Sequence, residues 1–304
     1  RLHVAPARVG KRAFLGNSGM TGPGRSVPKR GLVGVLSATP RKAKKGSSYL
    51  GMPPRPLRRS VERGEVGRTF APPRRLRVAR GLIEACRMVP VVASATLAVL
   101  VLGTVLAVAE AAGWLPAALA AGPALLAAGA VAAGLTVAAK WLLVGRFRVV
   151  EHPLWSAFVW RDELADTFVE VLAVPWLVGP VAGTPLLPAW LRAMGARIGR
   201  GVWLETHWLP ESDLVHLGDG ATVNRGCVVQ THLFHDRIMS MDTVRLEDGA
   251  TLGPNGIVLP GASVGDGTTV GPGSLVTRGD AVPPHTRWLG NPIGAWVGRG
   301  GRGG

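Results

Sequence analysis

Side chains able to perform acid–base chemistry are concentrated in one stretch of the chain, residues 223–237. The stretch holds two histidines, two arginines, one aspartate and one asparagine. Transfer of an acyl group to an amine or a hydroxyl needs a general base that removes the acceptor's proton. Histidine has the unperturbed pKa that suits this task near neutral pH. We therefore predict that His232 is the base of an acyl-transfer reaction.

The same stretch offers partners for this base. Asp236 or a backbone carbonyl would orient the imidazole, and Asn224 or a backbone amide would stabilise the tetrahedral oxyanion. His235 and Arg237 are candidates for binding the substrate. The alternative is that His232 and His235 only anchor the loop through hydrogen bonds.

His207 is a further substrate-binding candidate, because it lies close to the carboxylates of Glu205 and Asp213 and the repeat described below is interrupted there. A metal site made of His207, His232 and His235 would lack any local ligand spacing, so we predict no metal.

The two cysteines, Cys86 and Cys227, lie far apart in unlike segments and offer no disulfide framework or metal-ligand spacing. Cys227 falls within a repeat, where a buried small side chain is commoner than a nucleophile. This usage fits a reducing cytoplasm.

A six-residue repeat predicts how the candidates are positioned. From Leu246 to Val282, every sixth residue is Leu or Val. Gly, Asn and Asp follow several of them, and these residues tolerate positive φ in tight turns. The pattern predicts short strands, three to a coil, with the aliphatic residues stacked inward. Residues 194–296 are thus predicted to form a parallel β-helix, and the fold class to be mainly β.

One interruption of this repeat coincides with the ionisable cluster. Val229 and Leu246 are 17 residues apart, one short of a multiple of six. A loop is therefore predicted to leave the coil around residues 233–243. Loops that leave a rigid scaffold commonly carry function.

A partial copy of the repeat opens the chain, where Val9 and Leu15 keep the six-residue spacing. Residues 1–22 are predicted to be the end of a preceding β-helix domain, and the chain to be the C-terminal piece of a longer protein. Residues 23–80 are predicted to be a basic, Pro- and Gly-rich linker with short ordered pieces. The linker would be a solvated tether or a contact with anionic lipids.

Two apolar runs, residues 89–109 and 115–139, contain no charged residue. Each is long enough to cross a hydrocarbon core of about 30 Å as a helix. We predict an α-helical transmembrane hairpin over residues 81–148, with both ends in the cytoplasm because Arg and Lys flank the runs. The alternative is a buried helical pair in a soluble protein.

The neighbouring segments differ in composition. Residues 149–193 are rich in Trp and broken by Pro, which predicts an interfacial or re-entrant helical segment. Residues 297–304 contain only Val, Gly and Arg, and a disordered Gly/Arg tail is predicted there.

The formal net charge of +16 is localised. Residues 1–88 carry 21 Lys and Arg against 3 acidic residues, so the excess precedes the first apolar run. Membrane orientation accounts for this charge, and no base-reading motif or aromatic platform accompanies it. We predict membrane lipids as a partner and no nucleic acid.

Several strings in the chain are specific enough to suggest a family. They are Gly-Asn-Ser-Gly-Met (16–20), Gly-Leu-Val-Gly-Val-Leu-Ser (31–37), Gly-Ser-Ser-Tyr-Leu-Gly (46–51), His-Pro-Leu-Trp-Ser (152–156), Gly-Thr-Pro-Leu-Leu-Pro (183–188), Asn-Arg-Gly-Cys (224–227) and Gln-Thr-His-Leu-Phe (230–234). With the hexapeptide coils, they resemble the C-terminal region of membrane-bound non-ribosomal peptide synthetases of the poly-lysine synthetase type. The coils themselves resemble the left-handed β-helix acyltransferases.

The resemblance implies a left-handed parallel β-helix that joins aminoacyl monomers by amide bonds. The donor would be an aminoacyl group on the phosphopantetheine arm of a carrier domain, with acetyl-CoA as the alternative and no cofactor held by this chain itself. His232 and Asn224 match the loop strings and are implied site residues.

The resemblance also implies partners and a location. Upstream adenylation and carrier domains are expected, together with sibling β-helix domains arranged as a pseudo-trimer or a homo-oligomer. The β-helix domains would lie on the cytoplasmic side of the bacterial cell membrane.

Two other functions compete with the transferase. One is a non-catalytic β-helix scaffold domain of the same assembly, and the other is a coenzyme A-dependent acetyltransferase. A His232 that meets an acidic group on a cleft favours catalysis, whereas a His232 buried inside the coil favours the scaffold.

Overall fold

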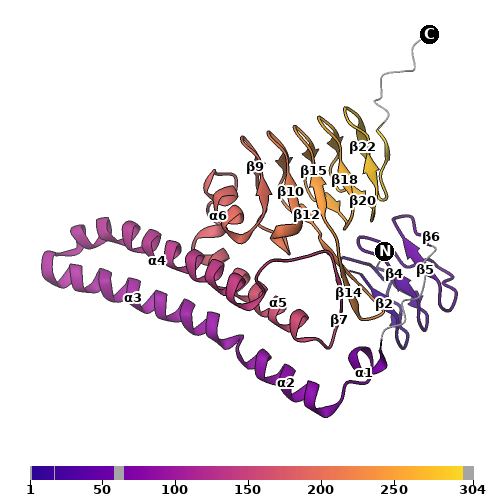
Figure 1. The fold of residues 1–304 in the computed structure, drawn as a ribbon, viewed down its shortest axis with the longest axis horizontal. Coiled ribbons are helices and arrows are strands. Elements are labelled where there is room, and N and C mark those ends of the chain that lie inside the picture. The colour runs from indigo at the N-terminus through magenta and orange to yellow at the C-terminus, as the bar shows by residue number, and fades with distance from the viewer. Residues whose placement is uncertain (1, 17, 58–64, 297–304) are drawn as a thin grey trace, which may run out of the picture.

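A computed structural model describes residues 2–16, 18–57 and 65–296. A stack of parallel strands carries a long helical hairpin at one side and a smaller N-terminal group of strands at the other (Figure 1). The segment predicted as a disordered tail, residues 297–304, lies outside the described residues.

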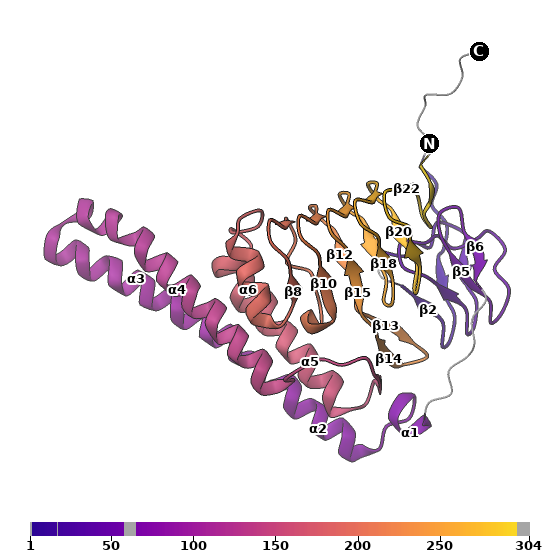
Figure 2. The ribbon, with the colours of Figure 1, turned by 45° about the horizontal axis from the view of Figure 1, so that its top comes forward.

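The stack is built from three parallel ladders. Paired residues in its regular coils are eighteen positions apart, as in Arg245 with Ser263 and Ile257 with Leu275. Each turn of the chain therefore adds one strand to every ladder, which is the predicted six-residue repeat with three strands to a coil. The successive coils follow one another along the stack in Figure 2.

The strands divide among the ladders as follows. The first ladder holds β8 (Arg197–Ile198), β10 (Val215–Leu217), β15 (Val244–Leu246), β18 (Ser263–Val264) and β21 (Ala281–Val282). The second holds β9 (Trp203–Leu204), β11 (Thr222–Val223), β16 (Thr251–Leu252), β19 (Thr269–Val270) and β22 (Arg287–Leu289), with β23 (Gly294–Ala295) antiparallel at its end. The third holds β12 (Val228–Val229), β17 (Ile257–Val258) and β20 (Leu275–Val276).

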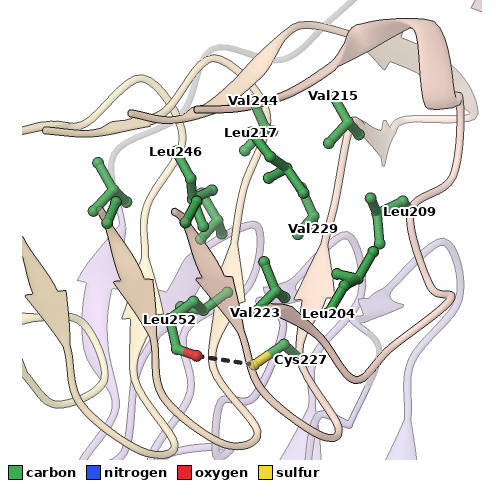
Figure 3. Packing of buried hydrophobic residues seen from close by; sticks show 14 of the residues in the cluster. Leu204, Leu209, Val215, Leu217, Val223, Cys227, Val229, Val244, Leu246 and Leu252 are labelled. Carbon is green, nitrogen blue, oxygen red and sulfur yellow. Dashed lines mark hydrogen bonds between the residues drawn. The ribbon is translucent and has the colours of Figure 1, made fainter. Parts of the chain in front are cut away.

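Aliphatic residues at the repeat starts fill the centre of the stack. Val258, Val264 and Val270 are each 0% exposed, and they belong to one continuous cluster. Figure 3 shows Val223 and Leu246 of this cluster pointing into the same interior. The inward direction predicted for the repeat starts is therefore correct, and burial of this column is the main stabilising contribution of the stack.

Cys227 belongs to the same core. It is 1% exposed, and its Sγ lies 3.7 Å from the carbonyl oxygen of Leu252 (Figure 3). Burial raises the pKa of the thiol to about 11. The prediction of a buried small side chain is confirmed, because a thiol this hard to ionise is a poor nucleophile.

The predicted interruption of the repeat is a β-hairpin. Strands β13 (His232–His235) and β14 (Ile238–Met241) pair antiparallel. The two turn residues, Asp236 and Arg237, have φ of 46° and 67°, as a tight hairpin turn requires. On its other edge, β14 pairs with β7 (Glu151–Pro153), so the hairpin is tied to the segment that follows the long helices.

The long helices are α3 (Met88–Ala112) and α4 (Trp114–Leu143), joined at Gly113, whose φ is 91°. Both are long and apolar enough to cross a membrane. Their exposed side chains are apolar, with Val99 68% and Leu119 71% exposed. Core helices of a soluble protein are mostly buried, so the soluble alternative fits these helices poorly.

The segment predicted to be interfacial or re-entrant is helical and packs on α4. It contains α5 (Ala157–Phe168), the π-helix η1 (Val169–Val178) and α6 (Leu186–Met194). Small residues of α4 allow η1 to approach closely, since a Cβ at Gly129 would stand 2.7 Å from the carbonyl oxygen of Trp176. The apolar face of α6 covers the first coil of the stack through Leu187 and Leu191.

Two shorter helices precede the hairpin, α1 (Val66–Thr69) and α2 (Arg74–Ala85). Arg80 in the middle of α2 and Arg87 just before α3 both donate to Glu163 of α5, at 2.5 Å and 3.1 Å. These ion pairs hold the start of α3 beside α5.

The N-terminal group continues the parallel repeat further than predicted. It comprises β1 (Arg8–Val9), β2 (Phe14–Leu15), β3 (Ser26–Val27), β4 (Leu32–Val33), β5 (Ser48–Leu50) and β6 (Arg55–Leu57). The parallel pairing of β2, β4 and β5 runs to Tyr49, well inside the predicted linker. Val27 and Val33 are each 1% exposed and keep the six-residue spacing between the Pro and Lys residues that suggested a tether.

This N-terminal group lies against the side of the stack near β20 and β22 (Figures 1 and 2). Val35 and Leu50 pack on Ile257 and Leu275. The side-chain amide of Asn291 also donates to the carbonyl oxygen of Leu36 at 2.6 Å. Two separate groups of parallel coils from one chain are thus placed side by side.

The hairpin topology can be tested with Trp114→Cys. Trp114 is 72% exposed at the hairpin tip. We expect a membrane-impermeant maleimide to label this cysteine in intact cells, because the tip would face the outside. Cys86, which is exposed just before α3, is the built-in control and should react only after permeabilisation. Protection of the new cysteine in intact cells would contradict the hairpin topology.

Candidate active site

Two interruptions of the stack meet in space. Residues 205–214, which include the 3-10 turn η2 (Ser212–Leu214), and the β13–β14 hairpin leave successive coils. The Thr231 hydroxyl donates to the carbonyl oxygen of Pro210 at 2.6 Å. This contact brings Glu211 to the start of β13.

Glu211 binds the predicted base directly. Nδ1 of His232 lies 2.7 Å from Oε1 of Glu211, and the Thr231 hydroxyl shares its one hydrogen between the other carboxylate oxygen and the Pro210 carbonyl. The Glu211 side chain is 0% exposed and that of His232 is 20% exposed. A carboxylate held in this way fixes the orientation of the ring and places the proton on Nδ1. Nε2 is then the basic atom, and no hydrogen bond within the described ranges occupies it.

The charge of Glu211 also changes the acidity of His232. Burial lowers the pKa of His232, but the Glu211 carboxylate and its hydrogen bond, helped by Asp166, outweigh burial and raise it above the ordinary value. A base with a raised pKa accepts a proton from the acceptor more readily, as long as the pH leaves it neutral.

Two carboxyl groups of α5 stand close to the pair. Burial, then the charge of Glu211, and also a hydrogen bond with Glu211 raise the pKa of Asp162 well above its ordinary value. Asp166 lies one helical turn further on. Burial and Glu211 raise its pKa to about 7, against the opposing influence of His232.

His232 and Asp166 face the same cavity, which has a volume of about 790 Å³. One wall is the stack with its hairpin, including Val228 and Ile257, and the opposite wall is the N-terminal group, including Leu50. A cavity of this size with mostly apolar walls and few polar groups is typical of a small-molecule site. It lies where the two groups of parallel coils face each other.

The structure separates the predicted partners of His232. The carboxylate bonded to its ring is Glu211, whereas Asp236 lies in the hairpin turn. Asn224 does not line the cavity, because it lies at a coil corner where its Nδ2 donates to the carbonyl oxygen of Leu252 at 2.8 Å. The predicted orienting and oxyanion roles therefore have no support at Asp236 and Asn224.

The predicted substrate-binding residues are also divided. His235 and Arg237 line the cavity, although Arg237 additionally donates to the carbonyl oxygen of Thr69 at 3.2 Å. His207 lies outside it, with Nε2 3.3 Å from a carboxylate oxygen of Glu170. Within the described residues, no cluster of His, Cys, Asp or Glu has the geometry to hold a metal ion.

Glu211 was not predicted as the partner of His232, because only carboxylates close to His232 in sequence were considered. The feature of the sequence that could have predicted this contact is the presence of two interruptions of the repeat in successive coils. Interruptions that leave a stack in adjacent coils must emerge side by side, so acidic residues of the first are natural partners for a histidine of the second.

A buried ion pair fixes this first interruption to the helical hairpin. Nζ of Lys140 lies 2.7 Å from a carboxylate oxygen of Asp213, and their side chains are 2% and 7% exposed. The same oxygen accepts from the backbone N–H of Phe147 at 3.2 Å. The end of α4 is thereby joined to the loop that carries Glu211.

Comparison with characterised proteins finds a related synthetase. The chain is 33% identical over 301 residues to the delta-poly-L-ornithine synthetase of Acinetobacter baumannii strain AB307-0294. The chain is thus similar in sequence to one region of this synthetase. The match covers 97% of the chain but only 23% of the length of the synthetase. No family model matches the chain.

Solved structures of acyltransferases share limited similarity with the chain. A hexapeptide-repeat acetyltransferase from Vibrio cholerae is 16% identical, covers 39% of the chain and 84% of its own length, and gives a TM-score of 0.32. An N-acyltransferase from Bacillus cereus is 18% identical, covers 28% of the chain and 52% of its own length, and gives a TM-score of 0.25.

Proposed function

We propose that this chain is an acyl-transferring part of a membrane-bound poly-amino-acid synthetase, in which His232 is the general base for amide formation. The observation that carries the proposal is that His232 lines the cavity of about 790 Å³ while the buried Glu211 holds its ring from behind. The synthetase relative supports a product made of amide-linked amino acids.

In the proposed reaction, the basic Nε2 takes the proton from an amine as its nitrogen attacks the carbonyl carbon of an aminoacyl thioester. The tetrahedral intermediate then collapses, the carbon–sulfur bond breaks, and the imidazolium returns its proton to the leaving thiolate. The donor would be an aminoacyl group on the phosphopantetheine arm of a carrier domain. Its thin, partly apolar arm suits a space between two groups of coils that are lined by aliphatic side chains.

An oxyanion donor is available beside the pair. Gln230 lines the cavity, and its amide nitrogen donates to the carbonyl oxygen of His232 at 2.9 Å. That nitrogen carries a second hydrogen, which would stabilise the charge that develops on the thioester oxygen.

The proposal includes a location and partners. The hairpin α3–α4 would span the bacterial membrane with both ends in the cytoplasm. The coils would form a left-handed β-helix on the cytoplasmic side, where they would meet carrier and adenylation domains. The exposed apolar surface of the hairpin and the basic residues before it support this orientation. The packing of the N-terminal group on the stack supports pairing between sibling β-helix domains.

Glu211→Gln tests the proposal through the pH dependence of turnover. Because the Glu211 carboxylate raises the pKa of His232, removing its charge should lower that pKa. The rise in rate that accompanies loss of the imidazole proton should then move to lower pH. At the optimum, turnover should fall about tenfold to a hundredfold, since the ring and the developing imidazolium lose their carboxylate. The measurement is the rate of amide formation by full-length synthetase in membranes. It would be made across pH 6 to 9, a range of about three units that includes the usual His pKa.

The outcome that contradicts the proposal is an unshifted profile with unchanged turnover. Glu205→Gln is a suitable control, because Glu205 belongs to the same interruption and bonds the backbone N–H of Arg225 at 3.0 Å. This control should leave the pH profile in place.

A further inference from the structure

We propose that Asp166 is a second catalytic base, which removes the first proton from an acceptor that arrives as an ammonium ion. This inference rests on the proposed function. An amine acceptor must lose two protons, and in this proposal Asp166 removes the first and His232 removes the second.

The chemistry of the acceptor requires two proton removals. An alkylamine is an ammonium ion at neutral pH, with a pKa of about 10. One proton must leave before the nitrogen has a lone pair for attack, and a second must leave as the carbon–nitrogen bond forms. A single histidine is suited to the second step, because its imidazolium then protonates the departing thiolate. The first proton needs another acceptor.

Asp166 has the position for this role. It lines the same cavity as His232 and is exposed to it, although protein surrounds it on most sides. Within the described part of the chain, no hydrogen bond or ion pair engages its carboxylate. The neighbouring acids of α5 are already engaged, since Glu163 is paired with Arg80 and Arg87.

The charges around Asp166 increase the affinity of its carboxylate for a proton. Four ionisable groups other than Asp162 act on it: Glu211 from the first interruption, His232 from the hairpin, and Glu163 and Glu170 from its own helical segment. Burial and the three carboxylates raise the pKa of Asp166 to about 7, while His232 lowers it. The charge of Asp166 in turn raises the pKa of Asp162. A carboxyl group with this pKa is a much better proton acceptor than an ordinary aspartate, yet it is still ionised in part at neutral pH.

Each proton and each bond in the two steps is accounted for. The Asp166 carboxylate takes a proton from the ammonium ion, and the neutral amine attacks the thioester while His232 takes the second proton. The carbon–sulfur bond breaks and the imidazolium protonates the thiolate. Asp166 later loses its proton to water in the cavity, so each amide formed releases one proton. The anionic carboxylate also gives the cavity a preference for cationic acceptors.

The test compares two acceptors in the full-length synthetase. One is the natural amine, and the other is an analogue with an aminooxy group in place of the reacting aminomethylene, which is already unprotonated at neutral pH. For Asp166→Asn we expect turnover with the amine to fall by at least about a hundredfold. Turnover with the aminooxy analogue should fall by less than about threefold, because only the His232 step remains. The wild-type rate with the amine should also rise with pH through about 7 as Asp166 ionises. In the variant, only the rise that accompanies loss of the His232 proton should remain.

Two further variants keep the outcomes distinct. Glu170→Gln removes one of the charges that raise the pKa of Asp166 but leaves the Asp166 carboxylate in place, so it should affect both acceptors only weakly. His232→Gln should slow both acceptors strongly. If His232→Gln slows both acceptors and Asp166→Asn slows them equally or not at all, the second-base role is wrong while the proposed function stands. If His232→Gln slows neither acceptor, the proposed function itself fails. Thermal melting of each variant in detergent excludes unfolding as the cause, since misfolding would slow both acceptors alike.

Discussion

Replacing His232 with alanine is expected to lower amide formation by the full-length synthetase about a hundredfold to ten-thousandfold, the usual effect of removing a positioned general base. The structure gives this expectation its physical basis. Glu211 holds Nδ1 of His232 at 2.7 Å, and Nε2 is the basic nitrogen of a residue on the cavity wall. No other described side chain both lines the cavity and shares the Glu211 carboxylate.

Alanine at position 232 also removes a partner from the buried Glu211 carboxylate, which would cost about 1 to 3 kcal/mol of stability. His232→Gln separates this effect from catalysis, because a glutamine amide can still donate to Glu211 but cannot act as a base. We expect the same loss of turnover with a smaller change in melting temperature. Product would be measured with membranes containing equal amounts of each protein.

His216→Ala is the matched control, because His216 lies on β10 of the stack and does not line the cavity. It should retain wild-type turnover. Full activity of both His232 variants, with the protein folded and inserted, would remove the catalytic assignment. The scaffold function would then describe this domain better.

Much of the fold was predictable because the hexapeptide repeat is a direct consequence of geometry. A strand of two or three residues followed by a turn brings every sixth side chain inward, so the aliphatic register at Leu246, Leu252 and Val258 could be read from the sequence. The interrupted coil was predictable for the same reason, since a single missing residue in the register must be absorbed by an excursion.

The extent of the N-terminal group was harder to predict. The signal there is only a few aliphatic residues, such as Val27 and Val33, among many Pro, Lys and Gly residues. Composition suggested a tether, whereas packing of Val35 and Leu50 against Ile257 supplies the stabilisation that the local sequence lacks. Tertiary contacts of this kind cannot be read from local composition.

The candidate site was predictable only in part. The chemistry of His232 follows from residue type and position, but its carboxylate partner depends on which excursions emerge side by side. Asp236 is four residues from His232 in sequence, yet it occupies a hairpin turn with φ of 46°. Glu211 is 21 residues away, about one coil earlier, and makes the contact. In a stack of coils, distance in space follows the coil period more closely than separation along the chain.

The stack itself is expected to fail when its aliphatic column receives a charge. Val264→Asp should destabilise the protein by about 4 kcal/mol or more, which is comparable with the whole stability of many domains. Val264 is 0% exposed, and its neighbours in the same ladder are Leu246 and Val282. The substitution removes about 1.5 to 3 kcal/mol of apolar burial, and it adds the cost of a carboxyl group that has no polar partner in an aliphatic column.

Ser263→Asp is the matched control for this column. It places the same side chain on the preceding residue of the same strand, where alternation of side chains directs it outward and Ser263 is only partly buried. A change at the exposed turn residue Asp266 should likewise be mild. Thermal melting and trypsin sensitivity of the detergent-solubilised protein would measure all three. Because each coil contacts only its neighbours, trypsin cleavage of Val264→Asp should begin in the coils that hold Leu246, Val264 and Val282. Equal melting temperatures for Val264→Asp and Ser263→Asp would contradict the inward direction of the column.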